Sequence, residues 1–124
     1  MDIFYIDFIA SDETPSSPLG YLVDNMPSSF SVQYPENDYI EVRFTLPNNI
    51  PEAEGYKFLG WRDSSGILKG AIYQPGHSFA LDVLAYDISG GAEFEFMGVW
   101  ERESSPDDPI TENKIYIKRN GSFV

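Results

Sequence analysis

Apolar and polar residues alternate along much of this chain, which is the pattern of strands that bury one face. The alternation is clearest in residues 39–46, whose expected inner face consists of Ile40, Val42, Phe44 and Leu46. Residues 28–34 (SSFSVQY) repeat it. Because the intervening segment at 35–38 (PEND) is made of turn formers, we predict that these two strands form a hairpin.

Further strands are predicted where β-branched and aromatic residues gather between turn-forming segments. They are residues 2–10, 56–61, 71–73, 78–84 and 92–100. A short helical turn within 19–26 is the one helix we expect, because no longer stretch shows a helical period. The chain therefore predicts a mainly β fold with a largely antiparallel sheet and at most one short helix.

Composition divides the chain into three parts. Residues 1–101 hold nearly all of the predicted strands and form the module. Residues 102–113 (RESSPDDPITEN) contain two prolines, several acidic residues and one large apolar residue, so they are predicted to be a linker. Residues 114–124 return to β character, and Asn120-Gly121 is a two-residue hairpin turn, so this segment is predicted to start a short β-hairpin repeat.

The chain is strongly acidic, with a formal net charge of −12 at pH 7. Such a field repels phosphate backbones and anionic lipids, so we expect neither nucleic acid partners nor membrane insertion. No run reaches the ~20 apolar residues of a membrane span. Asp2 and Asp7 interrupt the start of the chain, so any export is expected to be directed from elsewhere. There is no cysteine, so packing and backbone pairing must hold the fold together.

Several aromatic motifs follow one another in a fixed order. An LP…P segment at 46–51 precedes GYKFLGW at 55–61, YQPGHSF at 73–79 comes next, and a strand ends in VW at 99–100. In this order they resemble the Listeria/Bacteroides repeat family, also called the internalin-type B repeat. The residues that carry the motif are Gly55, Tyr56, Phe58, Gly60, Trp61, Tyr73, Pro75, Gly76, Phe79 and Trp100.

The resemblance implies a small β-grasp-like fold, used as a module in secreted and wall-attached bacterial proteins and in phage tail proteins of Gram-positive hosts. The sequence departs from the family in an added loop at 87–92 (DISGGA) and in a longer opening half between Ile9 and Phe30. The terminal IYIKRNGSF at 115–123 is similar to short repeats at the ends of phage tail and related surface proteins.

The motif also has a physical reading of its own. Gly55 and Gly60 would permit a bend or bulge in the aromatic strand, which leaves room for an indole to pack across it. Burying Trp61 and Trp100 would contribute ~2–3 kcal/mol each from apolar area. We therefore interpret both tryptophans as structural.

Candidate chemistry is sparse. His77 is the only histidine, and its place in YQPGHS predicts an exposed turn residue, although a single general base remains conceivable. The chain has no G-x-S-x-G elbow, no D-x-D-x-D-G calcium loop and no phosphate-cradling glycine loop. Paired acidic residues at 12/13, 52/54, 93/95 and 107/108 are interpreted as solvated surfaces. We predict no enzymatic activity, no cofactor and no metal.

These features predict a non-catalytic structural or host-contact module of a phage tail or other virion, or of a bacterial surface protein. Its expected partners are other virion or cell-surface protein domains, and its expected location is extracellular, on a cell surface or on a virion. One alternative is an adhesin module that binds glycan or protein through Tyr21, Tyr34 or Tyr39. Another is an accessory domain of a secreted hydrolase. A monomer is expected, because acidic side chains and prolines act against pairing of sheet edges.

Overall fold

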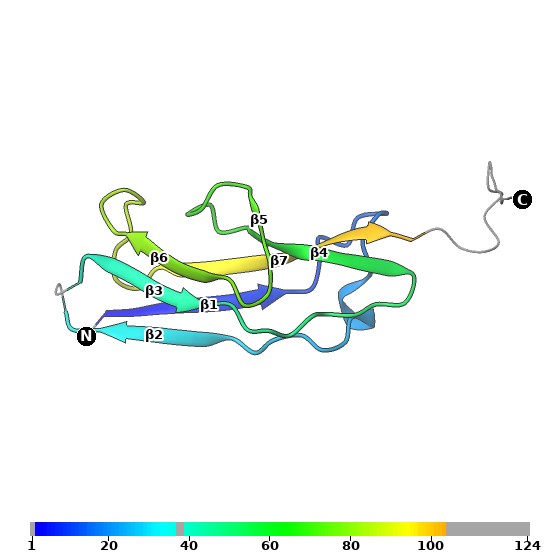
Figure 1. Ribbon diagram of the computed structural model, residues 1–124, viewed down its shortest axis with the longest axis horizontal. Coiled ribbons are helices and arrows are strands. Elements are labelled where there is room, and N and C mark those ends of the chain that lie inside the picture. Colours follow the sequence, from blue (N-terminus) through cyan, green and yellow to red (C-terminus); the bar gives the residue numbers. More distant parts are fainter. Residues whose placement is uncertain (1, 37–38, 104–124) are drawn as a thin grey trace, which may run out of the picture.

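This computed structural model describes residues 2–36 and 39–103. They contain seven strands and one 3-10 turn, which are joined by loops (Figure 1). The strands are β1 (Asp2–Ile9), β2 (Phe30–Tyr34), β3 (Glu41–Thr45), β4 (Tyr56–Asp63), β5 (Ile72–Tyr73), β6 (Ser78–Asp82) and β7 (Glu93–Arg102). The 3-10 turn, η1, is Gly20–Leu22, within the segment where the sequence allows a helical turn.

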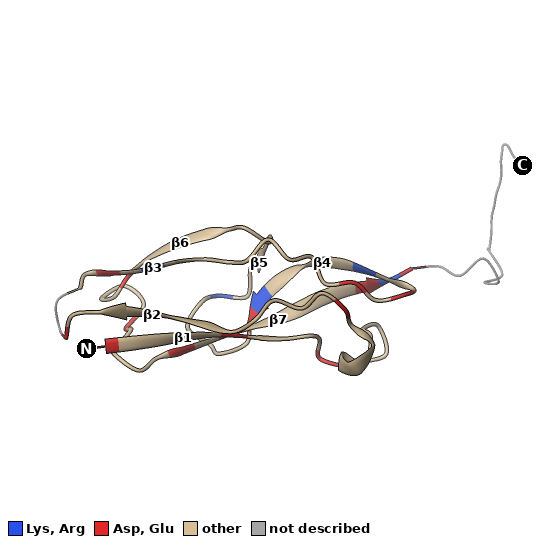
Figure 2. Ribbon diagram, turned by 90° about the horizontal axis from the view of Figure 1, so that it is seen from below, with Lys and Arg blue, Asp and Glu red and all other residues tan. Residues whose placement is uncertain are grey.

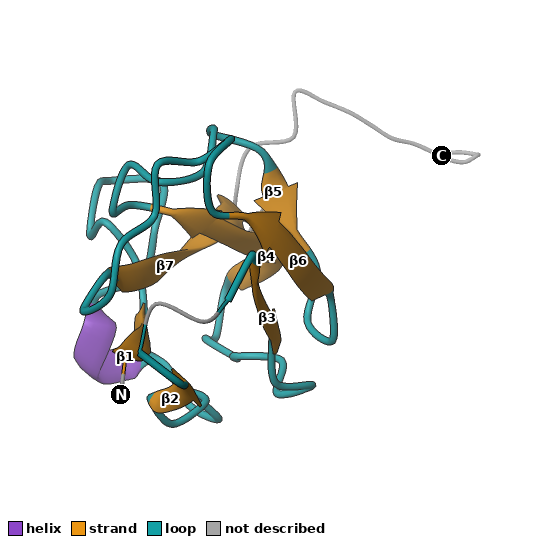
Figure 3. Cartoon of the chain, turned by 90° about the vertical axis from the view of Figure 1, so that its left-hand side faces the viewer, coloured by secondary structure: helices purple, strands orange, loops and turns teal. Residues whose placement is uncertain are grey.

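The strands form one mixed sheet and one smaller ladder. The sheet has five strands in the order β2-β1-β7-β4-β5, and β3 and β6 make a separate two-stranded ladder. At the centre of the sheet β1 and β7 run parallel, and the other pairings are antiparallel. Viewed end-on, β3 lies across the interior from β1 (Figure 3). The expected mainly β and largely antiparallel fold with at most one short helix is confirmed, and the β-grasp-like assignment stays a prediction.

Aromatic rings fill the space between the sheet and the ladder. The centroid of the Phe44 ring, on β3, lies 4.8 Å from that of Phe79 and 5.1 Å from that of Phe94. Phe79 lies 5.7 Å from Phe96 of β7. Buried apolar residues around them are Phe4, Ile6, Val42, Leu46, Trp61 and Leu81. Since alternate residues of each strand point inward, the period-two sequence pattern becomes one continuous core.

The predicted hairpin between residues 28–34 and 39–46 is wrong. β2 pairs with β1, and β3 pairs with β6, so the two neighbouring segments belong to different sheets. Both have the expected alternation, but their inner faces cover different walls of the core. A side-chain hydrogen bond links them instead of a ladder, since the Arg43 backbone N–H donates to the Tyr34 Oη at 2.7 Å.

Ile40 is a second correction, because this residue is 81% exposed. β3 begins only at Glu41, one residue later. The Ile40 carbonyl still accepts a hydrogen bond from the Val83 N–H at 3.0 Å. The backbone is therefore held in place while the side chain projects beyond the end of the core, whereas Val42 is buried as expected.

The last strand reaches slightly beyond residue 101, where the module was expected to end. Arg102 belongs to β7, and the Glu103 N–H donates to the Gly55 carbonyl at 2.9 Å. The rest of the predicted linker, residues 104–113, and the predicted hairpin repeat at 114–124 lie outside the described residues.

Candidate functional site

The two tryptophans of the motif lie in the interior. Trp61 has no exposed surface, and Trp100 is 6% exposed. The Phe58 ring packs edge-to-face against both, with centroid distances of 5.0 Å to Trp61 and 5.1 Å to Trp100. The Trp100 Nε1–H donates to the Ala10 carbonyl at 2.8 Å, which joins β7 to the segment after β1. Packing on this scale stabilises the fold and covers both indole rings.

Gly60 permits the close packing around Trp61. The register of β4 against β7 shifts between Phe58 and Gly60, which is the bulge that the sequence predicts at this position. Gly60 has a φ of +144°, and a Cβ there would overlap the Ile72 Cγ2 and lie 2.9 Å from the Tyr73 carbonyl oxygen. Glycine therefore lets β4 bend and lets β5 approach it.

The second half of the motif forms a small ring cluster. The Phe79 ring centroid lies 4.8 Å from that of Tyr73 and 4.6 Å from that of His77. Burial raises the pKa of the Tyr73 hydroxyl, and the charges of Tyr86 and Asp63 add to the effect. His77 is exposed next to the turn, as expected, and uses one edge of its ring for packing.

Pro75 and Gly76 form the turn that leads into β6. The Gly76 N–H donates to the carbonyls of Leu46 and Pro47, at 3.1 and 3.2 Å. Gly76 has a φ of +84°, which glycine adopts without strain. These two hydrogen bonds therefore hold the YQPG turn against the LP segment, which precedes the aromatic strand.

The three tyrosines predicted as ligand contacts do not share a surface. Tyr21, in η1, is 82% exposed. Tyr34 and Tyr39 pack edge-on against Phe4, with ring centroids at 5.9 and 5.2 Å. Burial raises the pKa of the Tyr39 hydroxyl, and a hydrogen bond with Asp2 adds to the effect. η1 and the end of β2 lie at opposite ends of the molecule (Figure 1), so Tyr21 is far from the other two.

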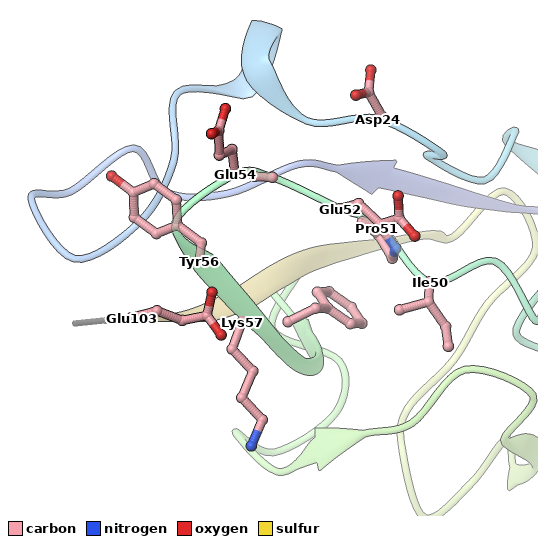
Figure 4. A pocket seen from close by; sticks show the side chains of 10 residues that line it. Asp24, Ile50, Pro51, Glu52, Glu54, Tyr56, Lys57 and Glu103 are labelled. Carbon is pink, nitrogen blue, oxygen red and sulfur yellow. The ribbon is translucent and has the colours of Figure 1, made fainter. Parts of the chain in front are cut away.

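An open groove of about 550 Å³ lies where the segment before β4 meets the end of β7 (Figure 4). Its apolar lining consists of Ile50, Pro51, Ala53, Tyr56 and Phe58. Its charged lining consists of Asp24, Glu52, Glu54, Lys57 and Glu103. Because Phe58 also rests on both tryptophans, the aromatic motif contributes to the floor of this groove as well as to the core.

Backbone hydrogen bonds fix the walls of the groove. Asp24 and Glu52 form an isolated β-bridge, with N–H to carbonyl distances of 2.8 and 3.0 Å. Glu103 is attached to Gly55 by the hydrogen bond described above. These pairs are far apart in the sequence, so the tertiary fold brings the three segments of the groove together.

Negative charge dominates the groove, because four carboxylates line it beside the single ammonium group of Lys57. Within the described residues, none of the four takes part in an ion pair. Figure 4 shows Asp24 and Glu54 on one side of Tyr56, with Lys57 and Glu103 on the other. Acidic positions also outnumber basic ones along the rest of the ribbon (Figure 2), so the groove lies in a negative field.

A second hollow of about 340 Å³ adjoins the groove. It shares Asp24, Ala53, Glu54 and Tyr56 with the groove. Pro18 and Leu22 complete its lining. Leu22 is 54% exposed and belongs to η1, so the hollow extends the groove towards that 3-10 turn.

The groove presents apolar and acidic side chains together. Among residues 2–36 and 39–103, no group of three or more His, Cys, Asp or Glu side chains could hold a metal ion. No helix in the same residues is long and apolar enough to cross a membrane. His77 is not among the groove-lining residues, so what the groove offers is an apolar floor with carboxylates around it.

No protein-family model, curated protein or solved structure matches the chain. The fold and the groove define a small, mainly β module with an acidic surface depression. The resemblance to the B-repeat family rests on the motif residues alone, and membership of that family stays a prediction.

The sequence did not predict the groove. The sequence indicates a solvated pair at Glu52 and Glu54, and nothing in it joins them to Asp24 or Glu103. That joining depends on the long-range backbone pairs. The available signal was the segment IPEAEG at 50–55, where acidic and apolar residues alternate directly before the aromatic strand.

Proposed function

We propose that this chain is a non-catalytic structural or contact module of an assembly outside the cell, either a phage tail or other virion or a bacterial surface protein. Its partners in this proposal are other protein domains of the same virion or cell surface. The order of the aromatic motifs supports this placement through the B-repeat resemblance. The charge of −12 disfavours nucleic acid and anionic membranes as alternatives.

One observation carries the proposal: the conspicuous aromatic residues are buried in the core, beneath an open acidic groove. Trp61 and Trp100 are covered, and Phe58 links them to the groove floor. The one histidine lies on a different turn, away from the groove lining. This distribution supports a role in binding and assembly, because the groove lining contains no histidine, the side chain that most often acts as a general base at neutral pH.

The test is localisation of the chain in the organism that encodes it. An antibody raised against the purified protein would be used on density-purified virions, on cell-wall extracts and on cytosol. We expect the chain to copurify with virions or with the wall fraction. Detection in the cytosol alone, in a culture that has released assembled particles, would reject the proposal.

A second candidate function, glycan binding by an adhesin module, is favoured by Tyr21. Tyr21 is 82% exposed, and the next residue, Leu22, lines the hollow that adjoins the groove. Exposed tyrosine rings stack on sugar faces, and neighbouring carboxylates accept hydrogen bonds from sugar hydroxyls. A glycan array would test this candidate: specific binding that is lost in Tyr21→Ala and kept in Tyr5→Ala, an exposed tyrosine on β1, would support it.

A further inference from the structure

The groove combines an accessible apolar floor with a rim of carboxylates. Ile50 keeps 55% of its surface exposed although its neighbour Pro51 is fully buried. Tyr56 and Phe58 are half-buried in the same depression, so each leaves part of its ring open to a ligand. An apolar surface with this degree of exposure can be covered by an apolar group of a partner.

Among residues 2–36 and 39–103, no ion pair neutralises the carboxylates around this floor. Asp24, Glu52, Glu54 and Glu103 come from three separate segments and are spread around one depression. Lys57 is the one cation in the lining. A partner with several positive charges would find complementary carboxylates at positions that the fold already fixes, so little ordering is needed on binding.

We propose that this groove binds an extended segment of a partner protein that carries lysine or arginine side chains next to apolar ones. Cationic side chains reach the carboxylates at the rim, and an apolar side chain of the segment packs on Ile50, Tyr56 and Phe58. The proposal rests on the contact-module function and names the partner chemistry of that module.

Lysine and arginine fit this site because each combines an apolar stem with a charged end. The stem can lie along the aromatic floor while the charge stays at the wet rim. Arginine can in addition stack on the Tyr56 ring and bind a carboxylate with two hydrogen bonds. A free divalent ion fits less well, since no three of the acidic residues are close enough to share one among the described residues.

The experiment measures binding of a fluorescein-labelled peptide of alternating lysine and tyrosine to the full chain by fluorescence anisotropy, at ~0.15 M salt. The double variant Glu52→Gln/Glu54→Gln should weaken binding about tenfold or more, since it removes two of the four carboxylates that line the groove. The matched control is Asp87→Asn/Glu93→Gln, which removes the same charge from exposed positions outside the groove and should change affinity less than about twofold.

The apolar part of the proposal has its own pair of variants. Ile50→Ser removes an exposed groove side chain and should weaken binding, whereas Leu84→Ser, at a position that is 90% exposed and outside the groove, should not. No binding by the unmodified chain would overturn the proposal. Equal weakening by both charge pairs would also overturn it, because that result shows a response to net charge alone.

Other occupants give distinct results. If the groove joined two copies of this chain, light scattering would show a dimer that Glu52→Gln/Glu54→Gln converts to a monomer. If residues 114–119 of the chain itself occupied it, replacing Lys114, Lys118 and Arg119 by glutamine would raise peptide affinity. Either result would overturn the proposal. Failure of peptide binding by a chain that copurifies with virions or wall would reject the groove chemistry and leave the contact-module function in place.

Discussion

Gly60 and Trp61 are adjacent residues of very different size, and close packing around Trp61 requires a residue without a side chain at position 60. The indole of Trp61 is fully buried, and β5 can lie against β4 beside it only because Gly60 has no side chain. The same strand carries Phe58, whose ring reaches both tryptophans and the groove. A short stretch of β4 therefore determines the packing of the core and the shape of the surface above it.

Gly60→Ala should be strongly destabilising. The new methyl group would overlap Ile72 in a backbone conformation that favours glycine, and overpacking with strain of this kind costs about 1–3 kcal/mol. Urea unfolding would measure the free energy of unfolding. Gly70→Ala is the matched control, since a Cβ at Gly70 meets no atom within 4 Å, and it should be nearly neutral. Equal stability of the two variants would contradict this account of Gly60.

At the scale of the elements, two edges of the fold meet without forming a ladder. β2 is one of the two edge strands of the larger sheet, and β3 belongs to the smaller ladder. Tyr34 connects them, since its hydroxyl accepts the Arg43 N–H and its ring packs on Phe4. One side chain thus satisfies a backbone donor that a neighbouring strand would otherwise pair.

Tyr34→Phe should loosen this connection with little change in the core. The phenylalanine ring keeps the packing, and loss of the acceptor should cost about 0.5–1 kcal/mol because water can replace it at this exposed position. Amide hydrogen exchange at Arg43 should become faster. Tyr21→Phe, in the exposed 3-10 turn, is the control and should leave the exchange rate of the Arg43 amide unchanged. An unchanged exchange rate in Tyr34→Phe as well would show that the Tyr34 hydroxyl does not protect this amide.

The sequence predicted which segments are strands better than which strands pair. Alternation in residues 28–34 and 39–46 identified two strands, because facing the core requires a period of two. The pairing partners β1 and β6 lie far along the chain, and local turn chemistry favoured the adjacent segment instead. The groove escaped prediction for the same reason, since Asp24 and Glu103 meet Glu52 only through the fold.

For the molecule as a whole, two partly buried tyrosines couple stability to alkaline pH. Burial raises the pKa values of Tyr39 and Tyr73 above the ordinary value of 10.0, since it disfavours the phenolate. The unfolded chain releases these protons first as pH rises. The stabilisation is therefore complete below pH 10.0 and is lost as pH rises through the higher folded-state values.

We therefore expect the free energy of unfolding to fall above pH 10.0, and urea unfolding at a series of pH values would measure it. The double variant Tyr39→Phe/Tyr73→Phe should show a shallower decline, because neither ring can then ionise. A decline of the same size in both proteins would assign the alkaline instability to other groups.

A strongly acidic module with an accessible apolar depression is suited to a cationic partner. The most direct test of this partner chemistry is carbodiimide crosslinking of the intact assembly, which joins a carboxylate to an amine that touches it, followed by mass spectrometry. We predict crosslinks from Glu52 or Glu54 to lysines of another protein. The account is contradicted if these carboxylates stay unlinked while exposed ones outside the groove, such as Glu93, are joined to the partner.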